Sequence, residues 1–168
     1  MKYVGGVGDA EEPRWLDSEE QQSWYALALL LNQLPTALDA QMQREAGIGQ
    51  FEYMVLSALS MAPKQTMRMS LLAEYAGATL SRLSNVVSRL EKRGWVTRSS
   101  DPSSGRTTLA TLTGDGLAVV EDAAPQHVAE VRRLVIDPLT KAQQRQLTAI
   151  ASHVLRAIDP ARALPEHP

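Results

Sequence analysis

Apolar residues recur every three or four positions along most of this chain, which predicts amphipathic helices rather than strands. The stretches with this pattern cover residues 17–45, 51–60, 113–137 and 140–158. Pro35 lies inside the first stretch, and we expect it to kink that helix because proline cannot donate the backbone hydrogen bond. The stretches at both ends carry more apolar surface than a compact domain needs, which favours a homodimer.

A short helix, a tight turn and a longer helix are predicted in the middle of the chain. We expect Ser70 to cap the short helix over 71–76, because a hydroxyl accepts hydrogen bonds from the free amides at a helix start. Gly77 permits the turn, and Thr79 is the expected cap of the longer helix. Gly94 stands just past the end of that helix, where glycine commonly ends one.

A β-hairpin is predicted after the longer helix. Its strands are expected over Trp95–Ser100 and Arg106–Leu112, separated by the turn formers Asp-Pro-Ser-Ser-Gly at 101–105. Residues Met67–Met69 form a further short stretch that is compatible with a strand. The expected fold class is therefore mainly α-helical with a small β-hairpin.

The longer helix has one apolar and one polar side. At 100° per residue, the apolar side holds Leu83, Val86, Val87 and Leu90. The opposite side and its flanks hold Ser81, Arg82, Ser84, Asn85, Ser88, Arg89 and Lys92. Within this helix, no acidic residue precedes Glu91, whereas an ordinary solvated helix face mixes glutamate with lysine. Short donor side chains and arginines suit close approach to a nucleic-acid groove.

Positive charge is concentrated in the same region. The whole chain has a net charge of −2. From Lys64 to Arg106, however, eight basic residues stand against three acidic ones, which gives +5 there and −7 for the remainder. A polyanion responds to the local field rather than to the total charge. The charge distribution is therefore compatible with a nucleic-acid partner.

Several classes of protein are disfavoured by what the sequence lacks. There is no cysteine, which excludes disulfides, thiolate zinc sites and thiol-based redox sensing. No apolar run is long enough to span a membrane and no signal-peptide pattern is present, so we expect a cytoplasmic protein. The histidines at 127, 153 and 167 are scattered and no common catalytic motif occurs. We expect no enzymatic activity, no metal and no cofactor.

Three motifs follow one another in a characteristic order. They are Arg-Leu-Glu-Lys-Arg-Gly-Trp-Val at 89–96, Asp-Pro-Ser-Ser-Gly-Arg at 101–106 and Leu-Thr-Gly-Asp-Gly at 112–116. This order resembles the MarR family of winged helix-turn-helix regulators, over nearly the whole chain. The N-terminus is rich in Gly and acidic residues and has few apolar anchors, which predicts a flexible arm over 1–16. The resemblance implies a single domain over 17–168. Within that domain it implies a winged helix-turn-helix over 50–113 and dimerisation helices over 17–46 and 114–160.

The resemblance also implies a function. Members of this family regulate transcription, commonly as repressors, and bind pseudo-palindromic double-stranded operators as homodimers in a sequence-specific way. We therefore expect a regulator of this kind, with no membrane partner. The alternative is a winged-helix module for protein–protein interaction that has lost DNA binding. That alternative predicts acidic replacements on the exposed face of the helix over 80–91, and the sequence has none before Glu91.

The family's contact positions correspond to particular residues of this sequence. Ser84, Asn85 and Arg89 match contacts with the groove and the phosphates, and Ser81, Arg82, Ser88 and Arg98 are expected beside them. Arg106 matches the arginine of the wing, which can enter a minor groove, and Asp101 matches the acid that orients it. The family often has a second charged residue in the wing tip, where this chain has Ser-Ser-Gly at 103–105.

Family members are often released from DNA by small aromatic or phenolic acids that bind between the dimerisation helices and the winged domain. The candidate residues for such a site are Trp15, Trp24, Phe51, Tyr53, Met54 and His127. Three of these, Trp24, Phe51 and Met54, are more simply explained as core residues. A urate-responsive branch of the family has an arginine where Val86 stands here, so urate is not the expected effector.

Overall fold

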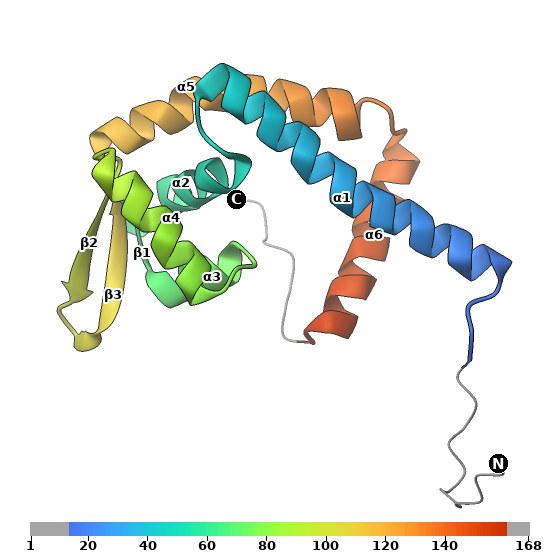
Figure 1. The fold of residues 1–168 in the computed structure, drawn as a ribbon, viewed down its shortest axis with the longest axis horizontal. Helices are drawn as coiled ribbons and strands as arrows, with labels where there is room; N and C mark the ends of the chain where they lie inside the picture. Colours follow the sequence, from blue (N-terminus) through green and yellow to red (C-terminus); the bar gives the residue numbers. More distant parts are fainter. Residues whose placement is uncertain (1–13, 161–168) are drawn as a thin grey trace, which may run out of the picture. The chain divides into compact units, whose positions relative to one another are not determined.

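The computed structural model describes residues 14–160 of the chain (Figure 1). The chain divides into two compact units between Leu34 and Pro35. The flexible arm expected over residues 1–16 lies almost entirely outside the described residues and stays a prediction.

The first helix, α1 (Ser18–Ala46), begins where the sequence predicts it. The Asp17 carboxylate accepts hydrogen bonds of 2.9 Å from the amides of Glu19 and Glu20. In return, the Glu20 carboxylate accepts a hydrogen bond of 3.0 Å from the amide of Asp17. These reciprocal contacts satisfy amides that a helix start would leave without partners. The helix continues through Pro35.

After α1, three short helices and a small sheet precede two longer helices. The helices are α2 (Gln50–Met61), α3 (Met69–Tyr75), α4 (Leu80–Lys92), α5 (Gly114–Val131) and α6 (Lys141–Ile158). The strands are β1 (Thr66–Arg68), β2 (Val96–Asp101) and β3 (Ser104–Leu112). A 3₁₀ turn, η1 (Pro63–Gln65), precedes β1, and a π turn, η2 (Arg132–Ile136), follows α5. The helix predicted to run to residue 137 therefore changes its hydrogen-bond pattern at Arg132.

The sheet is antiparallel with the strand order β1-β3-β2, so the hairpin strand β3 is central (Figure 1). The short strand and the hairpin expected from the sequence are both confirmed. The turn is shorter than predicted, because the strand pairing continues to Asp101 opposite Ser104. Only Pro102 and Ser103 lie between the two strands. Arg106 is a residue of β3, as the predicted strand over Arg106–Leu112 has it, and β3 begins two residues earlier.

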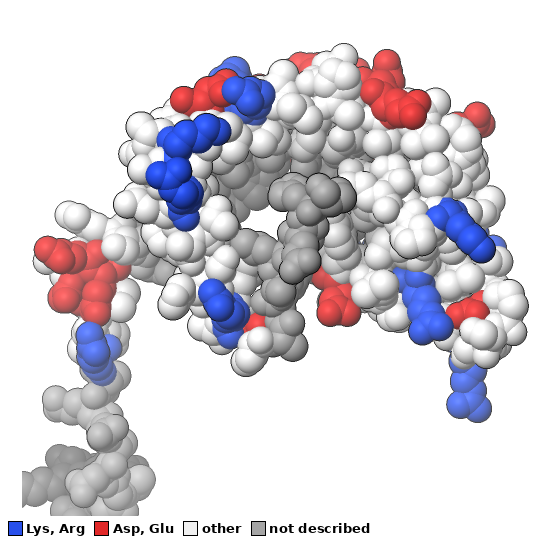
Figure 2. Space-filling model, turned by 180° about the vertical axis from the view of Figure 1, so that it is seen from behind, with Lys and Arg blue, Asp and Glu red and all other residues white. Residues whose placement is uncertain are grey.

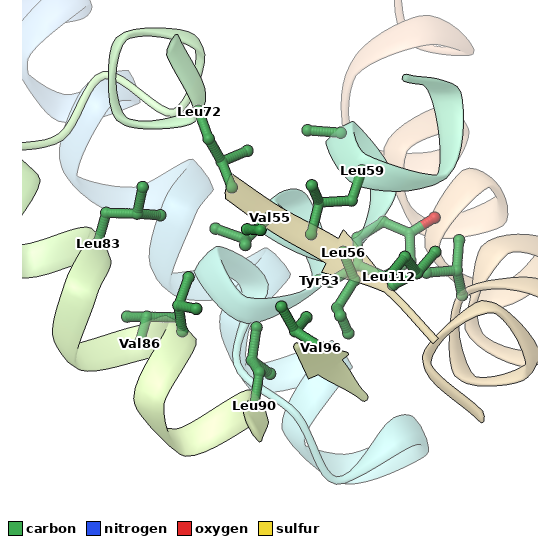
Figure 3. Close-up of a cluster of buried hydrophobic side chains, with 14 of the residues drawn as sticks. Tyr53, Val55, Leu56, Leu59, Leu72, Leu83, Val86, Leu90, Val96 and Leu112 are labelled. Atoms are coloured by element: carbon green, nitrogen blue, oxygen red, sulfur yellow. The ribbon is translucent and has the colours of Figure 1, made fainter. Parts of the chain in front are cut away.

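A single apolar core joins the helices to the sheet (Figure 3). The residues predicted for the apolar side of α4 are all buried there: Leu83, Val86, Val87 and Leu90. They meet apolar side chains of α2, α3, β2 and β3, among them Val55, Leu56, Leu59, Leu72, Val96 and Leu112. Burying one face of α4 in this way leaves its polar face outward.

The start of α3 differs from the sequence prediction. The helix begins at Met69 with Arg68 as its N-cap, so the expectation that Ser70 caps it is wrong. The reason is the pairing of Arg68 with Leu109, which keeps the chain extended up to the residue before the helix. Ser70 therefore lies inside the first turn. The turn after α3 agrees with the prediction, because Gly77 has a φ of +59° that favours glycine.

Both ends of α4 follow their predicted signals. The Thr79 hydroxyl accepts a hydrogen bond of 3.2 Å from the amide of Arg82. Gly94 has a φ of +76°, and the amides of Gly94 and Trp95 donate to the carbonyls of Glu91 and Leu90. This is the usual way in which a glycine ends a helix.

The C-terminal helices are capped by threonines, as expected. Thr113 accepts a hydrogen bond from the amide of Gly116 at the start of α5, and Thr140 and Gln143 form a capping box at the start of α6. No residue of α6 is buried. Among the described residues, no helix combines the length and the apolar character needed to cross a bilayer.

Candidate nucleic-acid interface

The outermost strip of α4 consists of side chains with no partner inside the protein. Ser81 and Asn85 are exposed, and their side chains take part in no hydrogen bond or ion pair within residues 14–160. Both lie opposite Leu83 and Val87, which anchor the helix in the core. The hydroxyl and amide groups of this strip are therefore available to an external ligand, as the sequence analysis expects of a groove-binding face.

On one flank of this strip, arginines of α4 are held by residues of α2. The guanidinium carbon of Arg82 lies 4.4 Å from the centre of the Phe51 ring, which is a cation–π geometry. The Nε of Arg89 donates a hydrogen bond of 3.1 Å to the Glu52 carboxylate. That carboxylate also lies 3.9 Å from a guanidinium nitrogen of Arg93. Because Arg89 bonds through Nε, its two terminal nitrogens remain available to another acceptor.

Glu52 is the residue of this flank that the sequence analysis did not assign to the interface. Its side chain is largely buried, and it accepts a hydrogen bond of 3.2 Å from the amide of Gly49 at the start of α2. It therefore caps α2 and orients Arg89 at the same time. Its position three residues after the helix start predicts only the capping role.

On the other flank, Arg98 of β2 reaches across α4. Its guanidinium donates hydrogen bonds to the hydroxyl of Ser88 at 3.0 Å and to that of Ser84 at 3.4 Å. The same group pairs with the Glu91 carboxylate, with Nε at 2.7 Å and Nη2 at 2.6 Å. Three residues expected at the site, Ser84, Ser88 and Arg98, are thus brought together. Their fourth partner, Glu91, was not expected there.

The acid of the wing has partners other than those predicted. Asp101 was expected to orient Arg106, and that pairing is wrong. The Asp101 carboxylate accepts hydrogen bonds from the amide and the hydroxyl of Ser103, at 2.9 and 2.6 Å, and pairs with Arg68 at 3.3 Å. The Ser103 hydrogen bonds, followed by the charge of Arg68, hold the pKa of Asp101 below its usual value.

The reason for this difference is the tight turn, which points Asp101 at its own turn and at β1 instead of at Arg106. Arg68 was counted among the basic residues of the region but was not recognised as the partner of this acid. Arg106 is exposed and, within the part of the chain that the structure describes, pairs with no carboxylate.

A cleft of about 260 Å³ lies between α3, α4 and the wing. It is lined by Met69, Ser70, Leu80, Ser84, Arg98, Arg106, Thr107 and Thr108. Two arginines and several hydroxyls thus face one space beside α4. Such a lining suits an anionic group that hydrogen-bonds through its oxygens. In the space-filling view, Lys and Arg side chains also lie on the wing side, at the lower right (Figure 2).

The residues expected to bind an effector do not form one cluster. Tyr53 and His127 lie together, with ring centres 4.7 Å apart. Phe51 instead faces Arg82, and Met54 is half-buried in α2. Trp15 and Trp24 belong to the first unit and are 83% and 56% exposed, so Trp24 is not a core residue there.

The Tyr53–His127 pair has the character of a partly buried polar site. Burial raises the pKa of Tyr53 and lowers the pKa of His127, because it disfavours the charged form of each. The Nδ1 of His127 is buried and has no hydrogen-bond partner among the described residues. Within the same residues, no group of three His, Asp or Glu side chains is arranged to bind a metal ion.

Comparison with protein families and solved structures shows which known proteins this chain resembles. Residues 47–107, which include α2, α3, α4, β2 and the first part of β3, match the model of the MarR family. The chain is 36% identical over 96 residues to an HTH-type transcriptional repressor of Mycobacterium tuberculosis. That alignment covers 56% of this chain, and the chain spans 66% of the length of that relative.

Solved structures are similar over more of the chain. A MarR family transcriptional regulator from Streptomyces coelicolor, crystallised in complex with DNA, is 43% identical with a TM-score of 0.86. The similarity covers 91% of this chain and 96% of that one. AbsC, a MarR family regulator from the same organism, is 32% identical with a TM-score of 0.83, covering 87% of this chain and 98% of that one.

Proposed function

Because the chain belongs to the MarR family of transcriptional regulators, we propose that it is a repressor that binds a pseudo-palindromic DNA operator as a homodimer. The observation that carries the proposal is the outer strip of α4, where Ser81 and Asn85 have no partner within the described chain. These side chains read base edges in the major groove, and the flanking arginines fix the helix on the phosphates.

The proposed phosphate and minor-groove contacts come from both flanks of α4. On the α2 side, Phe51 and Glu52 hold Arg82 and Arg89 in extended positions beside the helix. On the wing side, the free Arg106 enters the adjacent minor groove, where a narrow A·T-rich segment attracts a cation. The residues beside them, Ser84, Ser88, Arg98 and Asp101, belong to the same surface.

The homodimer is proposed on the apolar surface that the helices leave uncovered. In α6, Leu147, Ile150, Val154 and Ile158 are exposed along one side of a helix with no buried residue. In the first unit, the exposed apolar residues of α1 include Trp24, Leu30 and Leu31. We therefore assign 17–46 and 114–160 to dimerisation and 50–113 to DNA binding. The two copies of α4 then contact half-sites about 34–36 Å apart.

The test is selection of bound duplexes from a random pool, followed by mobility-shift titration of the selected duplex and a scrambled one. We expect the protein to prefer the selected duplex by at least about 1000-fold. Asn85→Ala should reduce this preference about tenfold or more while leaving affinity for the scrambled duplex nearly unchanged. Arg145→Gln, which removes an exposed charge of α6 outside the DNA-binding residues 50–113, is the control and should keep the preference. Failure to bind any duplex at low salt would refute the proposal and favour the protein-interaction module.

We also propose that a small aromatic effector releases the DNA by binding beside Tyr53 and His127. The support is the buried Nδ1 of His127, which lacks a hydrogen-bond partner among the described residues and lies next to an aromatic ring. Titration of the protein–duplex complex with a panel of aromatic and phenolic acids tests this. A compound that releases wild type but not the variant His127→Leu is expected, and release of both alike would place the effector elsewhere.

A further inference from the structure

We propose that Arg98 is a positioning residue that commits Ser84 and Ser88 to act as hydrogen-bond donors toward DNA. These two serines then select base pairs that offer an acceptor in the major groove, such as a purine N7. The inference rests on the proposed DNA-binding function and specifies how one flank of α4 reads sequence.

Several contacts with Glu91 hold the Arg98 side chain in a defined position. Its Nε and Nη2 lie 2.7 and 2.6 Å from one oxygen of the Glu91 carboxylate, and its own backbone amide donates to the other oxygen at 3.1 Å. The side chains of Arg98 and Glu91 are 31% and 27% exposed, so solvent reaches only part of the pair. A charge pair that is partly shielded from solvent and makes several hydrogen bonds keeps a fixed geometry better than a single exposed contact does.

The rest of the guanidinium is directed at the two serines. Nη2 donates to the Ser88 hydroxyl oxygen at 3.0 Å, and Nη1 approaches the Ser84 hydroxyl oxygen at 3.4 Å. Ser84 and Ser88 are one helical turn apart and lie on the wing side of α4. One cation from β2 therefore occupies an acceptor position on both hydroxyls at once.

A serine hydroxyl normally serves as donor or acceptor, so it discriminates poorly between bases. A neighbouring cation changes this, because it occupies a lone pair, repels any further N–H donor and polarises the O–H bond. The hydroxyl then donates its own proton outward. In the major groove, acceptors are the N7 of adenine and guanine, the O6 of guanine and the O4 of thymine, whereas the N4 amino group of cytosine is a donor.

The α4 helix thereby carries two kinds of polar side chain. Ser81 and Asn85 have no partner within the described residues and adapt to either a donor or an acceptor. Ser84 and Ser88 are half-buried beneath Arg98 and present a donor only. The rival role for Arg98 is a direct phosphate contact, for which its contacts with Glu91 and the two serines leave one N–H of Nη1.

The experiment uses the full chain and a duplex selected by the wild-type protein from a random pool. Each purine of one half-site is replaced in turn by its 7-deaza analogue, which puts carbon in place of the N7 acceptor. We expect wild type to lose about five- to tenfold in affinity at the purines that the serines contact, as for one hydrogen bond. The double variant Ser84→Ala/Ser88→Ala should lose sensitivity at those positions and thereby identify them.

Arg98→Ala should lose the same 7-deaza sensitivity although both serines are present. Glu91→Gln, which weakens the anchor and keeps the arginine, should reduce the sensitivity in part. Arg145→Gln again controls for the loss of one positive charge and should keep the wild-type pattern. Arg98→Lys provides a second variant that keeps the charge and removes the planar group that reaches both hydroxyls, and it should behave like Arg98→Ala.

Two outcomes would overturn the inference. One is that Arg98→Ala weakens binding to all duplexes alike and lowers the dependence of log Kd on log salt by about 0.9, as a lost phosphate contact does. The other is that the serine double variant keeps the wild-type 7-deaza pattern, so that the hydroxyls do not read bases. With either result the protein still binds DNA. If the proposed function is wrong, no duplex is selected from the random pool.

Discussion

At the scale of single residues, Arg106 places an exposed positive charge on the wing. It stands in β3 and pairs with no acid among the described residues, since Asp101 is occupied by Ser103 and Arg68. An arginine without an internal partner loses little by moving to an external anion. The Arg106 side chain can therefore bind a phosphate without first breaking an ion pair within the described residues.

Replacing Arg106 should weaken operator binding in a salt-dependent way. We expect Arg106→Ala to raise Kd about tenfold and to lower the slope of log Kd against log salt by about 0.9, the value for one phosphate neutralised. Fluorescence anisotropy at several salt concentrations measures both quantities. Arg106→Lys keeps the charge and should retain the slope. An unchanged Kd for Arg106→Ala would remove the wing from the interface.

His127 predicts a dependence of stability on pH. Burial lowers its pKa, so near pH 6 the folded state binds fewer protons than the unfolded state. The free energy of unfolding should therefore fall as the pH falls below about 6.5, the ordinary value for histidine. His127→Gln should flatten this fall in urea titrations between pH 7 and pH 5. A substitution of the exposed His153 serves as the control. Equal slopes of the unfolding free energy against pH in wild type and His127→Gln would contradict the prediction.

At the scale of elements, the start of α5 is hydrogen-bonded to the residues that connect α4 to β2. The amide of Thr113 donates to the Trp95 carbonyl at 3.0 Å, and its hydroxyl donates to the Gly94 carbonyl at 2.7 Å. Gly116 lies in the same contact, where a Cβ would overlap the Trp95 carbonyl oxygen. Only glycine lets the helix approach the strand so closely.

Gly116→Ala should therefore destabilise the winged unit by about 1–3 kcal/mol, as overpacking does. The midpoint of urea unfolding measures the change. Gly114→Ala, two residues earlier, is the matched control because no heavy atom lies within 4 Å of its added Cβ. It should be neutral or stabilise by about 0.5–1 kcal/mol. Equal effects of the two substitutions would argue against the close contact.

At the scale of the whole molecule, the apolar side of α6 is left exposed. The helix is 18 residues long, and its Ile150 and Ile158 are 62% and 74% exposed. A helix of this kind gains most of its stability from packing an apolar face. In the proposed homodimer, a second copy of the chain would supply a matching face by symmetry.

Truncation after Asp137 should convert the proposed dimer to a monomer, because it removes α6 entirely. Light scattering after size-exclusion chromatography measures the mass. Ile150→Asp is a milder version of the same test that leaves the helix in place, and Gln146→Glu, an exposed polar position of α6, is its control. A truncated chain that still forms a dimer at micromolar concentration would refute the proposed interface.

The sequence by itself determined the features that depend on neighbouring residues. The spacing of Leu83, Val86, Val87 and Leu90 predicted the buried side of α4, and Thr79 and Gly94 marked its ends. Such signals are reliable because a helix period and a cap act within a few residues. The ordered motifs then led to the MarR family, which the comparisons confirm.

Only the tertiary structure decided which charges meet. Glu52 and Arg89 are 37 residues apart, yet the packing of α2 on α4 places them 3.1 Å from each other. Asp101 met Ser103 and Arg68 instead of Arg106, because the pairing of β2 with β3 continues one step further than the turn residues indicate. The contacts of Arg98 with Ser84 and Ser88 likewise depend on the return of β2 across α4. Long-range contacts of this kind have no local pattern, since they depend on how the elements pack and not on the residues beside them.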